Sequence, residues 1–362
     1  MQKISPRSCI QALKPYVPGR SIEDIEAAYH PPQITKLGSN ENPLGANPNV
    51  IAAVQAVLPK MYLYPDGGSR NLRHTLAEFY KVKSEEILIG NGSDEVLLMI
   101  AAAFLNPGEK VLVSENTFSE YEFSGRLFDG EIVKIPLKNY RYDISAFIEK
   151  LSLKPKLIFL CNPNNPTGSY ITHQELEALL KVTAPETLVV VDEAYAEYST
   201  ATDFPNCLEL RKTYPQLLIS RTFSKIYALA ALRLGYIIAQ PEIILEMSRT
   251  KTPFNANLLA QVAAQTALED RAFVNKSLVT NETGKAFLTK TFSDLGLRYI
   301  NTEANFICFE SKRLALELCE DLARQGIIIR ALKSFGLDYW NRVTIGTEEQ
   351  NQRFVAALKT VI

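Results

Sequence analysis

Four short apolar runs in the chain each end in a cluster of polar residues that could bind a ligand. The runs lie at 87–90, 156–160, 188–191 and 217–220, and the clusters after them lie at 91–94, 162–168, 192–195 and 221–225. Together the clusters supply carboxylates, carboxamides, a lysine amine and a glycine-containing turn at a helix start, where backbone N–H groups can bind an anion. Ligands of open parallel sheets bind beyond the carboxyl ends of the strands. The four clusters therefore predict one pocket.

The elements that must position these residues alternate between strands and helices. The runs near 157, 188 and 217 are almost continuously apolar, as expected for strands that helices bury on both faces. A helix is expected from about residue 94 to residue 104, and further strands are expected at 111–114, 131–137 and 235–239. This alternation predicts an α/β domain with a largely parallel central sheet flanked by helices.

The same pattern divides the chain into three parts. Residues 1–40 contain several prolines that interrupt regular structure, and they are predicted to form an arm with one short helix near 21–29. Ser21 and Asp24 resemble a capping box at the start of this helix. Residues 41–250 carry the alternating pattern of a large domain. Residues 251–362 carry helical segments near 257–295, then short strands around 298–310 and 326–332, and a helix at 348–360. The last part is typical of a smaller α+β domain.

Composition excludes several classes of protein. Hydrophobic residues make up 46% and charged residues 22% of the 362 residues, and the formal charge is -1, so no overall field attracts nucleic acid or a membrane surface. The five cysteines are scattered, and the opening residues lack the apolar core of a signal peptide, which together favour a cytoplasmic protein. The only histidines are far apart and lack metal-ligand spacing, which argues against a His-rich zinc site and against a Ser-His-Asp hydrolase, and no metal is expected; they are His30, His74 and His173.

Three motifs carry a resemblance to a known family. They are NPNNPTG at 162–168, DEAY at 192–195, and Ser224-Lys225 followed eight residues after the lysine by Arg233. In their residues and in their order along the chain they resemble the class I and II aminotransferases, which are fold-type-I pyridoxal-phosphate enzymes. The resemblance runs from Asn40 to Gly346. It implies a large cofactor-binding domain and a smaller one. It also implies pyridoxal 5'-phosphate as cofactor, with a small-molecule amino donor and a 2-oxo acid acceptor.

The resemblance assigns roles to the residues of the predicted pocket. Lys225 matches the lysine that holds the cofactor as a Schiff base and moves the substrate Cα proton. Asp192 matches the carboxylate that pairs with the pyridine nitrogen and keeps the ring an electron acceptor. Asn165 and Tyr195 match the donors to the phenolic oxygen, although a turn residue and a core aromatic would fit the same positions. Phe118 matches the ring that stacks on the cofactor, where many relatives have tyrosine, and core packing is its alternative.

The cofactor phosphate also has matching residues. Gly92, Ser93 and Asp94 lie at the expected helix start, and an acidic side chain beside a phosphate makes sense there only if it caps the helix. Thr222 and Arg233 match the hydroxyl and guanidinium that complete the phosphate site. Tyr64 matches a tyrosine that reaches the phosphate in the neighbouring subunit, which implies a homodimer.

Other segments indicate the substrate. The segments 15–20, 38–43 and 326–330 look like those of the histidinol-phosphate aminotransferases within this family. That likeness implies a substrate site with Asn40, in which Tyr16, Arg330 and Arg342 hold the substrate phosphate and Arg342 also binds the glutamate carboxylate. A surface ion pair for Arg330 and a packed arm for Tyr16 are the alternatives.

The expected reaction is therefore transfer of the amino group of L-histidinol phosphate to 2-oxoglutarate in histidine biosynthesis. An aromatic amino-acid aminotransferase or a threonine-phosphate decarboxylase would share most of these motifs. A non-catalytic regulator that binds pyridoxal phosphate is a remote alternative, since no basic helix-turn-helix precedes the fold.

Overall fold

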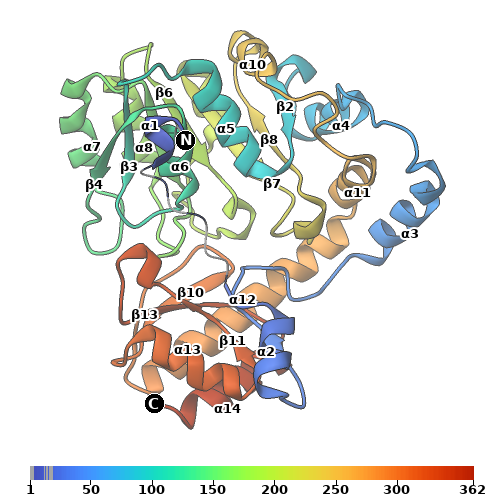
Figure 1. The fold of residues 1–362 in the computed structure, drawn as a ribbon, viewed down its shortest axis with the longest axis vertical. Coiled ribbons are helices and arrows are strands. Elements are labelled where there is room, and N and C mark those ends of the chain that lie inside the picture. The colour runs from blue at the N-terminus through green and yellow to red at the C-terminus, as the bar shows by residue number, and fades with distance from the viewer. Residues whose placement is uncertain (1–3, 12, 14, 16–18) are drawn as a thin grey trace.

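A seven-stranded sheet forms the centre of the larger part of the molecule (Figure 1). The computed structural model describes residues 4–11, 13, 15 and 19–362. The strands stand in the order β2-β8-β7-β6-β5-β3-β4, and all are parallel except β8, which is antiparallel to both of its neighbours. In chain order the strands are β2 (Ile87–Gly90), β3 (Lys110–Ser114), β4 (Glu131–Ile135), β5 (Leu157–Cys161), β6 (Leu188–Asp192), β7 (Leu217–Thr222) and β8 (Gly235–Ile238). A predominantly parallel sheet was predicted and is confirmed.

Helices cover both faces of this sheet because its strands are apolar on both sides. Alternate residues of one strand enter different cores: Phe159 joins the core under one layer of helices, and Ile158 and Leu160 join the core under the other. The first layer comprises α5 (Gly92–Phe104), α6 (Glu120–Leu127) and α10 (Pro241–Ser248). The second layer comprises α4 (Arg70–Tyr80), α7 (Ile144–Lys150), α8 (His173–Val182), α9 (Cys207–Thr213) and α11 (Leu258–Glu269), and α3 (Pro48–Val57) packs on α11.

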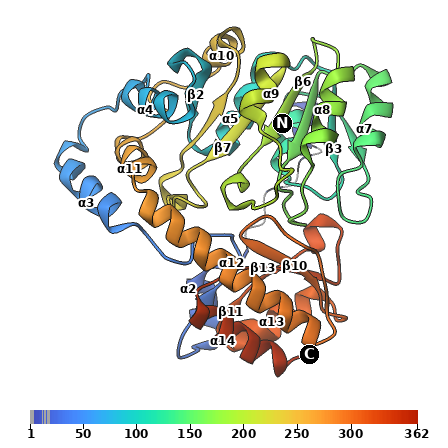
Figure 2. The ribbon, with the colours of Figure 1, turned by 180° about the vertical axis from the view of Figure 1, so that it is seen from behind.

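A four-stranded antiparallel sheet forms the smaller part, which lies below the large sheet in Figures 1 and 2. Its strands are β9 (Arg298–Tyr299), β10 (Phe306–Glu310), β12 (Arg330–Ala331) and β13 (Trp340–Thr344), and a separate parallel pair joins β1 (Thr35–Lys36) to β11 (Ile327–Ile328). Around them lie α2 (Ile22–Tyr29), α13 (Ala315–Arg324) and α14 (Glu348–Lys359). The long helix α12 (Arg271–Asp294) runs from the larger part into the smaller one.

Several predicted elements differ from the structure in detail. The helix expected from residue 94 begins at Gly92, and the helical stretch 257–295 is two helices separated at Asp270, which caps the second. Helix α13 and strand β13 were not predicted. The capping box of Ser21 and Asp24 is present at the start of α2. The domain boundaries at residues 40 and 250 remain predictions, and α11 lies beyond the second while packing on α3 and α4.

Among the residues that the structure describes, no helix is long and apolar enough to cross a membrane.

Candidate active site

One large cavity, of about 1460 Å³, lies at the carboxyl edge of the central sheet and extends to the four-stranded sheet. It brings together most of the residues predicted to form the pocket: Asn40, Ser93, Asp94, Phe118, Asn165, Asp192, Tyr195, Thr222, Lys225, Arg233, Arg330 and Arg342. Gly92 lies just behind this lining, against Arg233. Tyr16 lies outside the described residues, and Tyr64 does not line the cavity of its own chain.

The amine of Lys225 lies in this cavity on a short segment that follows β7. Its Nζ donates a hydrogen bond to the backbone carbonyl of Ser39 at 3.3 Å and lies 5.6 Å from the ring centre of Tyr195. Burial, aided by the positive charge of Arg342, lowers the pKa of Lys225 to about 8. At pH 7 about one-tenth of this amine is therefore uncharged and nucleophilic, far more than for a lysine with the usual pKa of about 10.4.

The carboxylate of Asp192 ends β6 and is almost fully buried. Its Oδ2 accepts a hydrogen bond from the hydroxyl of Tyr121 at 2.8 Å, and its Oδ1 accepts one from the backbone N–H of Ala194 at 3.2 Å. Burial raises the pKa of Asp192 to about 6, although both hydrogen bonds favour the charged form. The sequence predicted Asp192 in the pocket but gave no sign of its contact with Tyr121.

Two carboxamides and a tyrosine line the cavity near Lys225 and have hydrogen-bond partners in the protein. Asn40 donates through Nδ2 to the hydroxyl of Tyr195 at 3.0 Å, and its backbone N–H donates to Oγ1 of Thr344 at 2.9 Å. Arg342 donates to the side-chain oxygen of Asn165 and, at 2.8 Å, to the carbonyl of Gly38. These bonds leave the amide N–H groups of Asn165 and the hydroxyl hydrogen of Tyr195 as donors.

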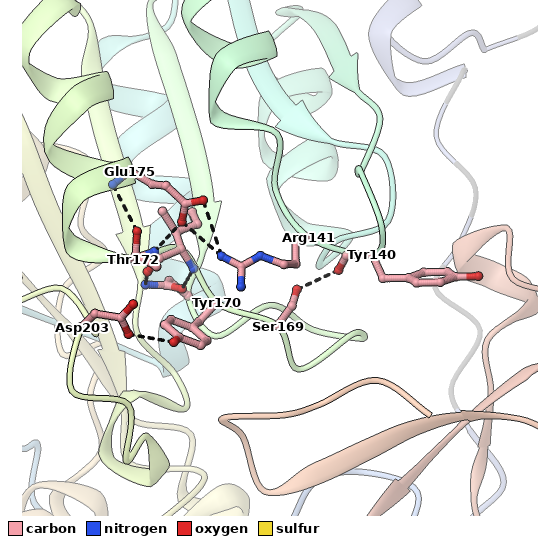
Figure 3. A network of polar contacts seen from close by, with 9 residues as sticks. Tyr140, Arg141, Ser169, Tyr170, Thr172, Glu175 and Asp203 are labelled. Carbon is pink, nitrogen blue, oxygen red and sulfur yellow. Dashed lines mark hydrogen bonds and ion pairs between the residues drawn. The ribbon is translucent and has the colours of Figure 1, made fainter. Parts of the chain in front are cut away.

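The loop that carries Asn165 is closed and anchored by polar contacts. Asn162 bridges its two ends, because its Oδ1 accepts from the backbone N–H of Ile171 at 2.7 Å and its Nδ2 donates to the carbonyl of the same residue at 3.2 Å. Beyond the loop, Glu175 pairs with Arg141 at 3.2 Å and caps α8 with Thr172 (Figure 3). The backbone on both sides of Asn165 is therefore held in place.

One corner of the cavity combines the start of α5 with the side chains of Thr222 and Arg233. Arg233 caps the short 3-10 helix Ala230–Leu232 and lies two residues before β8, and because β8 is antiparallel it starts at the edge where the other strands end. Its Nη2 lies 3.0 Å from Asp94 Oδ2. The φ of Gly92 is +84°, which favours glycine, and a Cβ there would lie 2.7 Å from the same nitrogen and displace the guanidinium. Thr222 directs its buried hydroxyl to the backbone at the same edge.

Two arginines form part of the opposite wall. Arg330 and Arg342 are direct partners in the register of β12 and β13, so their side chains leave the same face of the small sheet. Among the described residues, no carboxylate lies within ion-pair distance of Arg330. Like charges placed directly opposite each other on a sheet are unfavourable unless an anion lies between them. This wall is therefore suited to a substrate phosphate or carboxylate.

Two aromatic residues named by the sequence have different surroundings. Phe118 is half-buried in the cavity wall and packs edge-on against Tyr121, with ring centres 5.7 Å apart. Tyr64 is 82% exposed and stacks on Phe254 with ring centres 4.6 Å apart. The ring of Tyr64 is therefore displayed on the surface of its own chain.

Comparisons with known proteins identify the family. Residues 32–358 match the family model described as aminotransferase class I and II. The chain belongs to the class I and II aminotransferases.

Its relatives include proteins named histidinol-phosphate aminotransferase. The one from Moorella thermoacetica is 45% identical over 98% of this chain and 92% of its own length, and the one from Symbiobacterium thermophilum is 42% identical over 99% of both. The crystal structure of histidinol-phosphate aminotransferase from Sinorhizobium meliloti in complex with pyridoxal-5'-phosphate has the same fold. It superposes with a TM-score of 0.90 over the full length of both chains, at 23% identity.

The pKa of Lys225 in the cofactor-free aminotransferase gives a first prediction. The rate of reductive methylation at this lysine should reach half of its maximum near pH 8, because burial and Arg342 disfavour the ammonium form. The Arg342→Gln variant should shift this midpoint to higher pH, whereas Arg330→Gln should shift it less. Rates are measured by mass spectrometry of the peptide that contains Lys225. A wild-type midpoint near 10.4, the value of an ordinary lysine, would contradict the expectation.

Proposed function

We propose that this aminotransferase transfers the amino group of L-histidinol phosphate to 2-oxoglutarate and yields imidazole acetol phosphate and L-glutamate in histidine biosynthesis. The names and near-complete alignment of the curated relatives support this substrate. The observation that carries the proposal is the pairing of Arg330 with Arg342 across β12 and β13, in the same cavity as Lys225. Histidinol phosphate has a phosphate and no carboxylate, so a wall with two guanidinium groups suits it.

The residues of the cavity fit pyridoxal 5'-phosphate as cofactor. When bound, the cofactor supplies an aldehyde that condenses with amines and a ring that accepts an electron pair. Lys225 offers an amine with a pKa lowered to about 8 to the aldehyde, and Asp192 offers a buried carboxylate to the ring nitrogen. The start of α5 with Ser93, together with Thr222 and Arg233, would hold the phosphate. An anion there would compete with Asp94 for the guanidinium of Arg233.

Three side chains would hold the ring of the cofactor in place. Asn165 and Tyr195 keep free donors for its phenolic oxygen, because Arg342 occupies the side-chain oxygen of Asn165 and Asn40 donates to the hydroxyl of Tyr195. Phe118, in the cavity wall, would pack on one side of the ring. A fixed ring aligns the bond at Cα that is to be broken, which favours proton removal over other reactions.

Lys225 would also move the proton in each half-reaction. Once released from the cofactor, its amine can take the proton from the substrate Cα and return it elsewhere on the bound molecule. Arg342 and the burial of the site keep the pKa of this amine near the working pH, which favours transfer in both directions.

Substrate choice is tested by a panel of single-turnover half-reactions. Loss of the visible absorbance of the cofactor should be fastest with histidinol phosphate, because Arg330 and Arg342 can both bind its phosphate. Replacing Arg330 by Gln should lower the catalytic efficiency (kcat/KM) of the half-reaction with histidinol phosphate by about tenfold or more, the loss expected for one charged hydrogen bond. The catalytic efficiency with glutamate should fall less.

The alternatives give different results in the same panel. Faster conversion of phenylalanine or tyrosine than of histidinol phosphate would indicate an aromatic aminotransferase. Release of carbon dioxide from threonine phosphate would indicate a decarboxylase, and failure to turn over any donor, glutamate included, would indicate a regulatory protein. The cytoplasmic location stays a prediction of the sequence.

The quaternary structure is part of the proposal. A homodimer, in which Tyr64 reaches the cofactor phosphate of the partner subunit, is supported by the exposure of Tyr64 and by its absence from the cavity of its own chain. Exposed apolar side chains next to it would be buried in such an interface; they are Met61, Tyr62, Leu63 and Phe254.

Hybrid dimers test the sharing of the site between subunits. Tyr64→Ala should weaken cofactor binding by about tenfold, the cost of one hydrogen bond to a charged group, and Lys225→Ala should abolish turnover. When the two variants are mixed and exchanged, half of the hybrid's sites contain both native residues, so tight cofactor binding and turnover should return together. Tyr339→Ala, at an exposed tyrosine that is not part of this group, is the control that should keep tight binding. If subunits exchange but neither tight cofactor binding nor turnover returns, the active site is not shared between subunits.

A further inference from the structure

Tyr121 is a fully buried residue of α6 whose hydroxyl contacts the carboxylate of Asp192. Its ring stacks on Phe159 with centres 5.2 Å apart and planes inclined by 5°, and it meets the edge of Phe118. Complete burial and these two aromatic contacts restrict the movement of the ring. Its hydroxyl therefore points to Oδ2 of Asp192 at 2.8 Å in a fixed direction.

The hydrogen bond has only one possible polarity when Asp192 is ionised. Burial and the neighbouring carboxylate raise the pKa of Tyr121 well above its usual value, so the phenol keeps its proton and donates it. The backbone N–H of Ala194 donates to the other carboxylate oxygen. With one donor on each oxygen, rotation of the carboxylate about its Cβ–Cγ bond is restricted, and each oxygen keeps a lone pair for a further partner.

We propose that Tyr121 is a positioning residue that holds the carboxylate of Asp192 ionised and in one orientation toward the cavity. The role toward the cofactor rests on the proposed function, because Asp192 acts on the ring nitrogen only if pyridoxal phosphate is bound. Tyr121 itself does not line the cavity, so its hydroxyl would act on a ligand through Asp192 and not by direct contact.

When Asp192 pairs with a ring nitrogen, the proton between them can be on the nitrogen or on the carboxylate. A carboxylate that already accepts a hydrogen bond has a lower affinity for the proton, so the proton stays on the nitrogen. Without the phenol, the buried carboxylate would hold this proton itself, and a bound ring would be a poorer electron acceptor. Tyr121 thus offsets part of the cost of burying Asp192 and would favour the protonated form of a bound ring.

The Tyr121→Phe variant removes this hydroxyl and keeps the packed ring. Tyr142→Phe is the matched control, because Tyr142 is also a buried tyrosine whose hydroxyl accepts from the backbone of Cys161 at 3.0 Å without contacting Asp192. In cofactor-free protein, carbon-13 NMR of labelled aspartate follows the titration of Asp192, with Asp192→Asn for assignment. We expect Tyr121→Phe to raise the pKa of Asp192 and Tyr142→Phe to leave it unchanged.

With pyridoxal phosphate bound, two further measurements separate positioning from a general loss of structure. In Tyr121→Phe the half-reaction with histidinol phosphate should slow by about tenfold with little change in KM, as the loss of one hydrogen bond to a charged group implies. The nitrogen-15 shift of a labelled cofactor ring should move toward the unprotonated value. Both quantities should stay at wild-type levels in Tyr142→Phe.

The role of Tyr121 and the binding of pyridoxal phosphate are tested by different measurements. An unchanged Asp192 titration in Tyr121→Phe overturns the role of Tyr121, whatever the enzyme binds. If the wild-type protein binds no pyridoxal phosphate, the proposed function fails, and the titration of Asp192 still decides whether Tyr121 stabilises its carboxylate. If Tyr121→Phe alters the titration of Asp192 but leaves both the nitrogen-15 shift of the cofactor ring and the half-reaction rate unchanged, the role of Tyr121 toward the cofactor is overturned.

Discussion

Burial of the Asp192 carboxylate is the most demanding feature of the large sheet, because an ionised group without partners is costly in a protein interior. The carboxylate ends the central strand β6, and it is stabilised by one donor from α6 and one from the following backbone. The stacking of Tyr121 on Phe159 and the packing of α6 on the sheet are needed to bring the first of these donors into place. A carboxylate placed and satisfied in this way is available to a positive charge in the cavity.

The alternation of side chains along β6 separates this functional charge from a structural one. Glu193 is the next residue along the chain and faces the other side of the sheet, where it forms a buried ion pair with Arg221 at 2.7 Å. Arg221 immediately precedes Thr222, just as Glu193 immediately follows Asp192. The ion pair therefore links the ends of β6 and β7 on one face, while Asp192 and Thr222 serve the cavity on the other.

Much of the fold could be predicted from the sequence, because strands buried on both faces must be apolar and their positions follow from that pattern. Strand β13 was missed since Asn341 and Arg342 are polar, although both are buried. Their polarity reflects the cavity and the hydrogen bonds of the small sheet. The contact between Tyr121 and Asp192 could not be predicted, because it joins residues 71 positions apart whose meeting depends on how α6 packs on the sheet. The motifs predicted which residues meet in the cavity, and they gave no information about what holds them there.

The central claim is that the amine of Lys225, among all the lysines of the chain, binds the aldehyde of pyridoxal phosphate. The most direct test is borohydride reduction of the protein in the presence of the cofactor, followed by peptide mapping by mass spectrometry. We expect a single phosphopyridoxyl group per chain, attached to Lys225, and no specific label in the Lys225→Arg variant. A protein that gains no label, or one labelled at a different lysine, would contradict the assignment of Lys225.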